Sequence, residues 1–197
     1  MNPAYLGIKN ISSLDYILKY LESIDDSSGV AVFFDWDDTL VNPDYDTIIE
    51  PEITRKLFDH LKENRIFYAI ITGRFHDTVC DDMKRNIFDM KHNIIHTIHP
   101  SLKKLGVNVD RYLTDEYTKT IYKIYNKYGE CVGVLYMGII FTGRKGETIK
   151  NYFLQTGINK PHTLFIDDYE PYLIETTSSM PTIKAFRRMV GYVPLTQ

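Results

Sequence analysis

Apolar residues follow two patterns along the chain, and each pattern predicts a different element. Apolar positions three to four residues apart predict helices over Ser12–Ile24, from Pro51 onward, from Phe75 to about Met90, and over His99–Leu105, Thr114–Tyr128 and Lys145–Thr156. Short continuous apolar runs predict buried strands at Val30–Phe34, Ile66–Ile71, Val132–Tyr136, Ile139–Phe141, Thr163–Ile166 and Thr182–Phe186. Strands that alternate with helices predict an α/β fold with a Rossmann-like, mainly parallel sheet flanked by helices.

The same spacing predicts details within two of the helices. In the helix after Phe75, the spacing predicts an inward face formed by Val79, Met83, Ile87 and Phe88. Gly157 is predicted to end the helix that begins at Lys145, because glycine adopts the left-handed conformation common after a last helical turn.

The length of 197 residues predicts a single domain over 1–197, since two domains of ordinary size would be cramped. The stretch from Thr72 to Lys145 is longer than one helix and one strand need. Two interpretations stay open for its middle part, about 86–138. It forms a small cap that selects substrates and excludes water, or it enlarges the core domain.

Composition limits the classes of partner and the compartment that are expected for this chain. The net charge is −3 and the chain has no basic stripe, only short basic pairs such as Lys84-Arg85, so nucleic acid is not indicated as a general partner. Cys80 and Cys131 are too few for a disulfide framework, which makes a reducing compartment the default. No signal peptide or membrane-spanning stretch is seen, so a cytoplasmic location without a membrane partner is expected.

Polar side chains follow three predicted strands at ends that meet on one rim of a parallel sheet, where ligands bind. They are Asp35, Asp37 and Thr39 after the first strand, Thr72 after the second, and Asp167 and Asp168 after a later one, with Lys145 opening the preceding helix. Clustered carboxylates resist joint ionisation unless a cation lies among them. Mg²⁺ binds carboxylates together with substrate phosphate oxygens. The set therefore predicts phosphoryl transfer from a small phosphorylated substrate, with Mg²⁺ as cofactor.

Four short motifs resemble, in order, those of the haloacid dehalogenase-like (HAD) hydrolase superfamily. Phe33–Val41 matches an apolar strand followed by Asp-x-Asp-x-Thr, and Ala69–Thr72 matches the second motif. Lys145-Gly146 is similar to the third motif, and Phe165–Asp168 to the acidic fourth. The resemblance implies a HAD-like fold, and the aspartate at position 37 favours a phosphatase over a dehalogenase.

The resemblance also implies roles for individual residues. Asp35 is the nucleophile that forms an aspartyl-phosphate, and Asp37 is the general acid and then the general base. Thr72 binds the phosphoryl group, and Lys145 stabilises both Asp35 and the transferred phosphate. Mg²⁺ is held by Asp35, the backbone carbonyl of Asp37, and Asp168.

Further substrate contacts are expected from Thr39, Thr72, Gly73 and Arg74, although an ordinary ion pair is an equal alternative for Arg74. Asp167 is expected to support the metal site without binding the ion.

The chain departs from the family pattern at a few positions. A bulky Trp36 and an acidic Asp38 flank Asp37, at sites that vary in the family. Lys150 competes with Lys145, which is preferred because the first turn of a helix reaches the strand ends. Glu170 is the nearest further acid of the fourth motif, and its role stays open.

Other interpretations of these residues are weaker. A calcium loop fails because Leu40 stands where glycine is needed and Asp46 where glutamate is needed. A receiver domain would place its lysine after all of the acidic residues. His92, His96 and His99 invite a zinc site, but no glutamate lies between the first two to form a hydrolytic pair.

Two alternatives to a general phosphatase keep the fold. The enzyme is specialised for nucleotides or nucleic-acid ends, which a basic groove beside Asp35 would indicate. Otherwise the chain is a non-catalytic binding module, although every carboxylate of the motifs is present.

Overall fold

The fold is built on one mixed sheet. The computed structural model describes residues 7–75, 80 and 83–189. Within them, eight strands form the sheet in the order β1-β10-β9-β2-β5-β8-β7-β6. The strands are β1 (Lys9–Ile11), β2 (Val30–Phe34), β5 (Phe67–Thr72), β6 (Ile121–Tyr125), β7 (Cys131–Tyr136), β8 (Ile139–Phe141), β9 (His162–Asp167) and β10 (Lys184–Arg188). A separate small hairpin pairs β3 (Val41–Asn42) with β4 (Thr47–Ile48).

Strand direction divides the sheet into two parts. All neighbours from β1 to β8 in the sheet order are parallel. The pairs β8–β7 and β7–β6 are antiparallel. Short connections join these strands, at Met137-Gly138 between β7 and β8 and at residues 126–130 between β6 and β7. The protein is therefore an α/β protein with a mostly parallel central sheet, as the sequence predicts.

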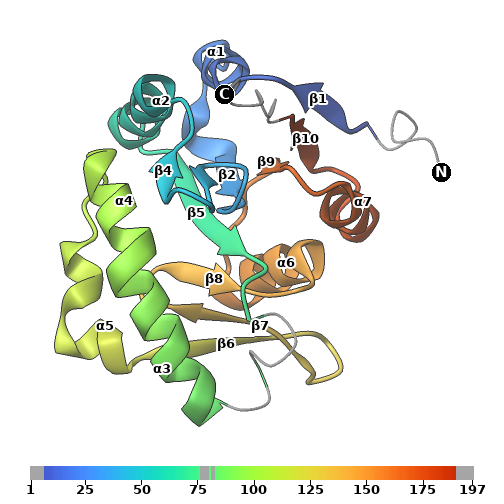
Figure 1. Ribbon diagram of the computed structural model, residues 1–197. Coiled ribbons are helices and arrows are strands. Elements are labelled where there is room, and N and C mark those ends of the chain that lie inside the picture. The colour runs from blue at the N-terminus through green and yellow to red at the C-terminus, as the bar shows by residue number, and fades with distance from the viewer. Residues whose placement is uncertain (1–6, 76–79, 81–82, 190–197) are drawn as a thin grey trace.

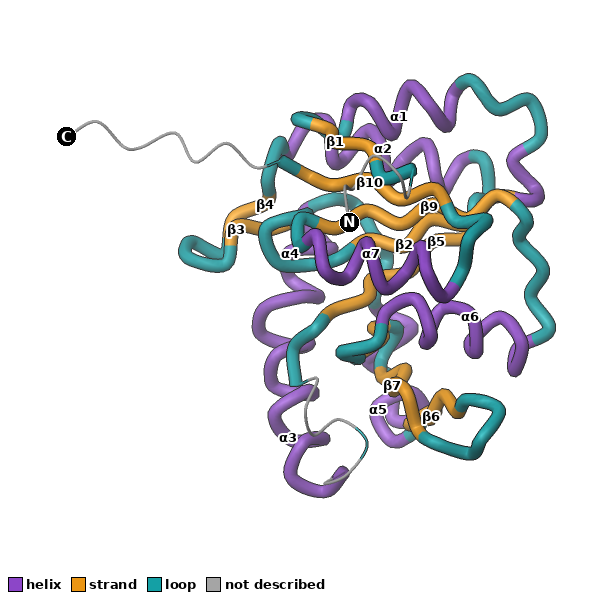
Figure 2. Tube along the Cα trace, turned by 90° about the vertical axis from the view of Figure 1, so that its right-hand side faces the viewer, coloured by secondary structure: helices purple, strands orange, loops and turns teal. Residues whose placement is uncertain are grey.

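Helices cover both faces of the sheet. They are α1 (Asp15–Glu22), α2 (Pro51–Glu63), α3 (Met83–Asn93), α4 (His99–Lys104), α5 (Asp115–Lys119), α6 (Lys145–Thr156) and α7 (Glu170–Ser179). Figure 1 shows α1, α2 and α4 on one side of the strands and α6 and α7 on the other. Figure 2 shows the β3–β4 hairpin extending beyond the ends of the parallel strands.

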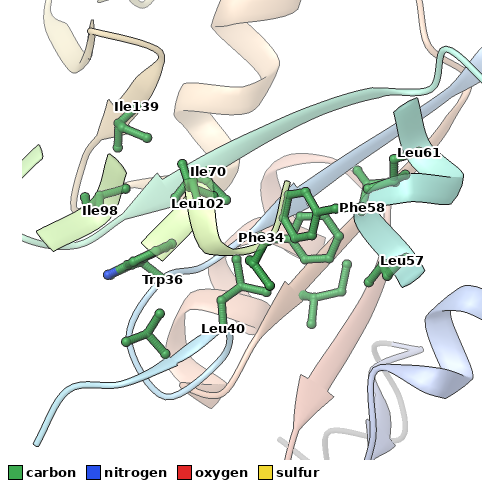
Figure 3. Close-up of a cluster of buried hydrophobic side chains, with 14 of the residues drawn as sticks. Phe34, Trp36, Leu40, Leu57, Phe58, Leu61, Ile70, Ile98, Leu102 and Ile139 are labelled. Atoms are coloured by element: carbon green, nitrogen blue, oxygen red, sulfur yellow. The ribbon is translucent and has the colours of Figure 1, made fainter. Parts of the chain in front are cut away.

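Two apolar layers hold the helices on the sheet. On the α2 side, Phe34 and Phe58 place their rings 5.5 Å apart, and both are buried. Leu102 from α4 lies beside Ile70 and Trp36 in the same cluster (Figure 3). On the α6 and α7 side, the cluster includes Phe33, Ile71, Phe165, Ile149 and Leu173. Adjacent residues of one strand thus point into opposite layers, so strands such as β2 are apolar throughout.

Most predicted elements are present. Strand β2 and helix α6 have the predicted bounds, and α2 begins at Pro51 as predicted. Gly157 ends α6 in the left-handed conformation, with φ of 68°.

The helix predicted over Thr114–Tyr128 is wrong. Its first part is the short helix α5, and residues Ile121–Tyr125 form the edge strand β6. Strand β6 pairs with β7 along its whole length, from Ile121 opposite Tyr136 to Tyr125 opposite Cys131. Isoleucine and tyrosine favour strands, and the partner strand decides the outcome.

The inward face predicted for the helix after Phe75 is partly wrong. Phe88 is 73% exposed, whereas Ile87 is half-buried and Met90 is fully buried. Val79 and the side chain of Met83 lie outside the described residues. Helix α3 continues through a π-helical turn at Ile94–Ile98 into α4. The buried residues along this path are Met90, Ile94, Ile98 and Leu102, four residues apart.

Cys80 and Cys131 form a disulfide across a sequence separation of 51 residues. The bond ties the segment after β5 to the start of β7. The expectation of reduced cysteines therefore differs from the structure, because a count of two cysteines says nothing about whether they meet in space.

The stretch 86–138 contributes to the sheet as well as to its surroundings, since β6 and β7 belong to the central sheet.

No helix in the described part of the chain combines the length and apolar character that crossing a membrane requires.

Candidate functional site

Acidic residues converge where two neighbouring strands end. Asp35 follows β2 directly, and Asp167 is the last residue of β9. These strands pair in parallel with Phe34 opposite Ile166, and the amide of Asp35 donates a hydrogen bond to the Ile166 carbonyl at 2.9 Å. The sheet register therefore brings Asp35 and Asp167 to the same rim.

Lys145 joins these two aspartates. Its side chain is 1% exposed, and Nζ donates to Oδ1 of Asp35 and, at 2.7 Å, to Oδ2 of Asp167. The ammonium also lies 4.4 Å from the ring centre of Tyr172. All three charged side chains are buried, at 7% exposure or less, so their charges depend on one another.

The close approach of α6 to α7 positions Lys145. A Cβ on Gly146 would lie 2.4 Å from the Thr176 Cα, so only glycine permits this spacing. Glu175 of α7 accepts hydrogen bonds from the amides of Gly146 at 2.7 Å and Glu147 at 3.1 Å. These bonds satisfy amides at the first turn of α6, which have no partner within a helix.

Burial alters the proton affinities of the cluster. Burial raises the pKa of Asp35 to about 7, because Lys145 offsets this effect only in part and Asp167 adds to it. The pKa of Asp167 is also raised, mainly by burial. Burial lowers the pKa of Lys145, but the two carboxylates outweigh that effect and hold it above its usual value. The lysine therefore stays protonated at neutral pH.

Asp168 completes a triad of carboxylates. One oxygen from each of Asp35, Asp167 and Asp168 lies within 4.8 Å of the others. Burial and the neighbouring Asp35 and Asp38 raise the pKa of Asp168 to about 6. Closely spaced acids with raised pKa values are stabilised by a divalent cation.

Asp167 uses both of its oxygens within the protein. Oδ2 accepts from Lys145, and Oδ1 accepts from the Tyr169 amide at 2.8 Å. Asp35 and Asp168 therefore have the more available oxygens, and the donor set fits a hard, oxygen-binding ion such as Mg²⁺.

Asp37 lies apart from this triad. Arg74 donates to it from Nε at 2.8 Å and from Nη2 at 2.5 Å. The Asp37 side chain is 31% exposed and the Arg74 side chain is 22% exposed. Both groups are thus accessible to solvent beside a buried cluster. The ion-pair alternative for Arg74 is the one that the structure contains.

Trp36 and Asp38, which flank Asp37, both have structural roles in the loop after Asp35. Trp36 is fully buried in the apolar layer, and its carbonyl accepts from the amides of Leu40 and Val41, both at 3.1 Å. Asp38 adopts a positive φ of 56°, which aspartate tolerates better than most residues. The turn returns the chain to β3.

Two of the other residues predicted to contact the substrate, Thr72 and Thr39, are fully buried. The Thr72 hydroxyl accepts from the Arg74 amide at 3.2 Å, and the Thr39 hydroxyl has no hydrogen-bond partner in the described structure. A Cβ on Gly73 would lie 2.7 Å from the Tyr172 hydroxyl, so Gly73 and α7 approach closely.

Lys150 and Glu170 do not belong to the cluster. Lys150 is exposed on α6, which favours Lys145 as the site lysine. Glu170 forms an ion pair with Arg187 at 2.5 Å.

The three histidines do not form a metal site. His92 and His96 are exposed with ring centres 4.4 Å apart, whereas His99 is buried and contacts the Met137 carbonyl at 3.2 Å. Within the described residues, the acidic triad is the one group with metal-binding geometry.

Sequence reasoning missed Tyr172 and Glu175, which support Lys145 from α7. The only sequence signal was Gly146 beside the lysine, since a glycine within a helical pattern often marks close packing. In comparisons with known proteins, no family model, curated protein or solved structure matches this chain.

Proposed function

We propose that this protein is a Mg²⁺-dependent phosphatase that hydrolyses a phosphomonoester through an aspartyl-phosphate on Asp35. The observation that carries the proposal is the buried bridge from Lys145 to Asp35 and Asp167 beside Asp168. A purely structural site would gain little from burying two carboxylates around one ammonium with a third, half-buried carboxylate beside them, because the desolvation of charges is costly. Such clusters are typical of reactive sites.

Asp35 and Asp37 have different roles in the reaction. An oxygen of the Asp35 carboxylate attacks phosphorus, and the bond from phosphorus to the ester oxygen breaks. Protonated Asp37 gives its proton to the leaving oxygen and then takes a proton from water. That water attacks the phosphorus of the aspartyl-phosphate, the bond to Asp35 breaks, and inorganic phosphate leaves.

Lys145 favours the ionised, nucleophilic form of Asp35 and orients it. The ammonium favours the charged carboxylate, and its second bond to Asp167 limits rotation of the lysine. When phosphate binds, the same charge opposes the repulsion between two anions.

Asp35, Asp168 and the backbone carbonyl of Asp37 are the groups that would hold Mg²⁺. When bound, Mg²⁺ supplies positive charge that neutralises phosphate oxygens during transfer. Asp167 anchors Lys145 and the Tyr169 amide beside this site.

Arg74 makes the contacts of Asp37 depend on whether substrate is bound. A phosphate oxygen competes with Asp37 for the guanidinium, because both are anions that accept two parallel hydrogen bonds. Binding of substrate at Arg74 therefore frees the Asp37 carboxyl group to turn towards the leaving oxygen. Thr72 and Gly73 directly precede Arg74 at the end of β5, and Thr39 follows Asp37 in the loop after β2, so these three residues are the further candidates for substrate contact.

The test is phosphate release from a panel of phosphomonoesters, with Mg²⁺ and with EDTA. We expect Mg²⁺-dependent turnover that falls at least about a thousandfold in Asp35→Asn, which keeps the shape but removes the nucleophile. Asp44→Asn is the matched control, since Asp44 is exposed on the hairpin loop.

The outcomes separate the alternatives. Asp35→Asn turnover at the wild-type rate contradicts the nucleophile assignment. Wild-type protein that releases no phosphate from sugar, nucleotide, nucleic-acid-end or amino-acid phosphates favours the binding module. Release from nucleotides or nucleic-acid ends alone favours the specialised enzyme.

A further inference from the structure

A cavity is lined by none of the residues of the acidic cluster. Its volume is about 420 Å³, within the range of small-molecule sites. It lies against the amino-terminal half of β5 and the turn before β8, and α4 and residues 107–122 close its other side. None of the residues in the proposed reaction lines it. Figure 1 shows α4 and α5 beside this part of the sheet.

The cavity contains an interrupted strand edge. Strand β5 pairs with β2 from Phe67 onward, but it pairs with β8 only from Ile70 onward. On the side of β8, residues 67–69 therefore have no neighbouring strand in the described part of the chain. Phe67, Tyr68 and Ala69 all line the cavity. Backbone amides and carbonyls on an unpaired edge are strong hydrogen-bonding groups.

Aromatic side chains surround this edge. Tyr68, Tyr112, Tyr122 and Tyr152 line the cavity. Burial raises the pKa values of Tyr68 and Tyr152, so their phenols stay protonated and can donate hydrogen bonds. Flat apolar walls with polar tips suit a flat ring that has polar atoms on its edge.

A positive charge lies at the same cavity. Arg111 lines it and is exposed, and its guanidinium is 4.5 Å from the ring centre of Tyr112. No carboxylate in the described residues forms an ion pair with Arg111. Nη2 of Arg111 donates a hydrogen bond to the Tyr112 hydroxyl, and no hydrogen bond from its Nη1 is seen in the described residues. An arginine stacked on an aromatic ring with a further N–H to donate is a common arrangement for binding anions.

We propose that this cavity binds a flat heteroaromatic molecule that carries one anionic group, with a nucleotide as the fitting size. The ring lies between the tyrosines with its polar edge on the backbone of residues 67–69. The anionic group pairs with Arg111. An entirely apolar ligand would leave the strand edge and the arginine without partners, which is unfavourable.

The site is separate from the phosphatase reaction, so the probe must not be a phosphomonoester. Adenosine 3′,5′-cyclic monophosphate has the ring and a single diester charge. We expect saturable binding to the wild-type protein by isothermal titration calorimetry, in the micromolar range, roughly 1–100 μM. Asp35→Asn should bind it equally well, whatever its effect on turnover.

Two variants locate the binding. Thr120→Trp places a large ring at the cavity from an exposed position and should abolish binding. Arg111→Gln should weaken it roughly tenfold, because one charge-assisted contact is lost. Arg55→Gln is the matched control: Arg55 is exposed on α2 and does not line this cavity.

Each outcome is informative. Uncharged adenosine should bind the wild type about as weakly as the cyclic nucleotide binds Arg111→Gln. Absence of saturable binding to the wild type overturns the proposal. Binding that survives both cavity variants also overturns it, because the probe then occupies another surface.

Discussion

Arg74 holds Asp37 with two donor atoms, Nε and Nη2, at 2.8 and 2.5 Å. A two-bond ion pair of this kind fixes the carboxylate in one orientation. In the proposed reaction the same guanidinium receives the substrate phosphate, so Arg74 has two anionic partners that compete.

Arg74→Gln removes the charge that binds both partners. We expect kcat/KM for the best phosphomonoester to fall roughly 10- to 100-fold, mostly through a higher KM, since a charge-assisted contact to phosphate is lost. Steady-state kinetics measure both constants, with Arg55→Gln as the control. An unchanged KM would show that Arg74 serves Asp37 alone.

Lys145→Met leaves two buried carboxylates without their cation. We expect the free energy of unfolding to fall by about 3–5 kcal/mol at neutral pH, as measured by urea denaturation. The double variant Lys145→Met/Asp167→Asn should regain part of that loss, because one uncompensated charge is gone. A double variant no more stable than Lys145→Met would contradict the electrostatic explanation.

Gly146→Ala tests the contact between α6 and α7. Alanine gains about 1 kcal/mol of helix preference over glycine, yet its Cβ would lie 2.4 Å from the Thr176 Cα. We expect a net destabilisation of about 1–3 kcal/mol from the overpacking. Lys150→Ala, exposed on the same helix, should change stability by less than about 0.5 kcal/mol. A stabilised Gly146→Ala protein would show that the helices separate easily.

Cys80→Ser tests the cross-link between the segment after β5 and β7. Closing a loop across a separation of 51 residues is worth up to about 4 kcal/mol in the chain-entropy description. We expect a lower urea midpoint for Cys80→Ser, and the same decrease for the wild type under reducing conditions. A reductant that lowers the midpoint of Cys80→Ser as well would point to an effect other than this bond.

His99 gives the stability a pH dependence. Burial lowers its pKa, while the bond to the Met137 carbonyl acts in the opposite direction. The unfolded chain therefore binds the proton more readily than the folded chain does. Stability from this residue is complete above the unfolded pKa and is lost as the pH falls below it.

Urea denaturation at several pH values measures this effect. From about pH 7.5 to about pH 5.5, the wild type should lose more stability than His99→Gln, which cannot take up a proton there. Equal losses in the two proteins would assign the pH dependence to other groups.

The sequence predicts the parallel part of the sheet well because its strands are buried on both faces. A run such as Val30–Phe34 is apolar at every position, so no partner needs to be known to identify it. The edge strand β6 is different. Its exposed tyrosines, Tyr122 and Tyr125, match either element, and only pairing with β7 selects the strand.

In the candidate site, too, some residues could be predicted from the sequence and others could not. The residues at the strand ends, including Asp35 and Asp167, could be predicted to meet because parallel strands end at one rim. The supporting contacts of Tyr172 and Glu175 depend on how α7 packs against α6. That packing leaves no regular spacing in the sequence, so these residues could not be predicted from it.

The Lys145 bridge also has a consequence during synthesis. Asp35 precedes its counter-ion by 110 residues, a delay of roughly 5–20 s on the ribosome. Until α6 emerges, burying the end of β2 would place an unmatched negative charge in an apolar layer. The rim around Asp35 is therefore expected to stay hydrated until Lys145 has been synthesised and α6 can pack against the sheet.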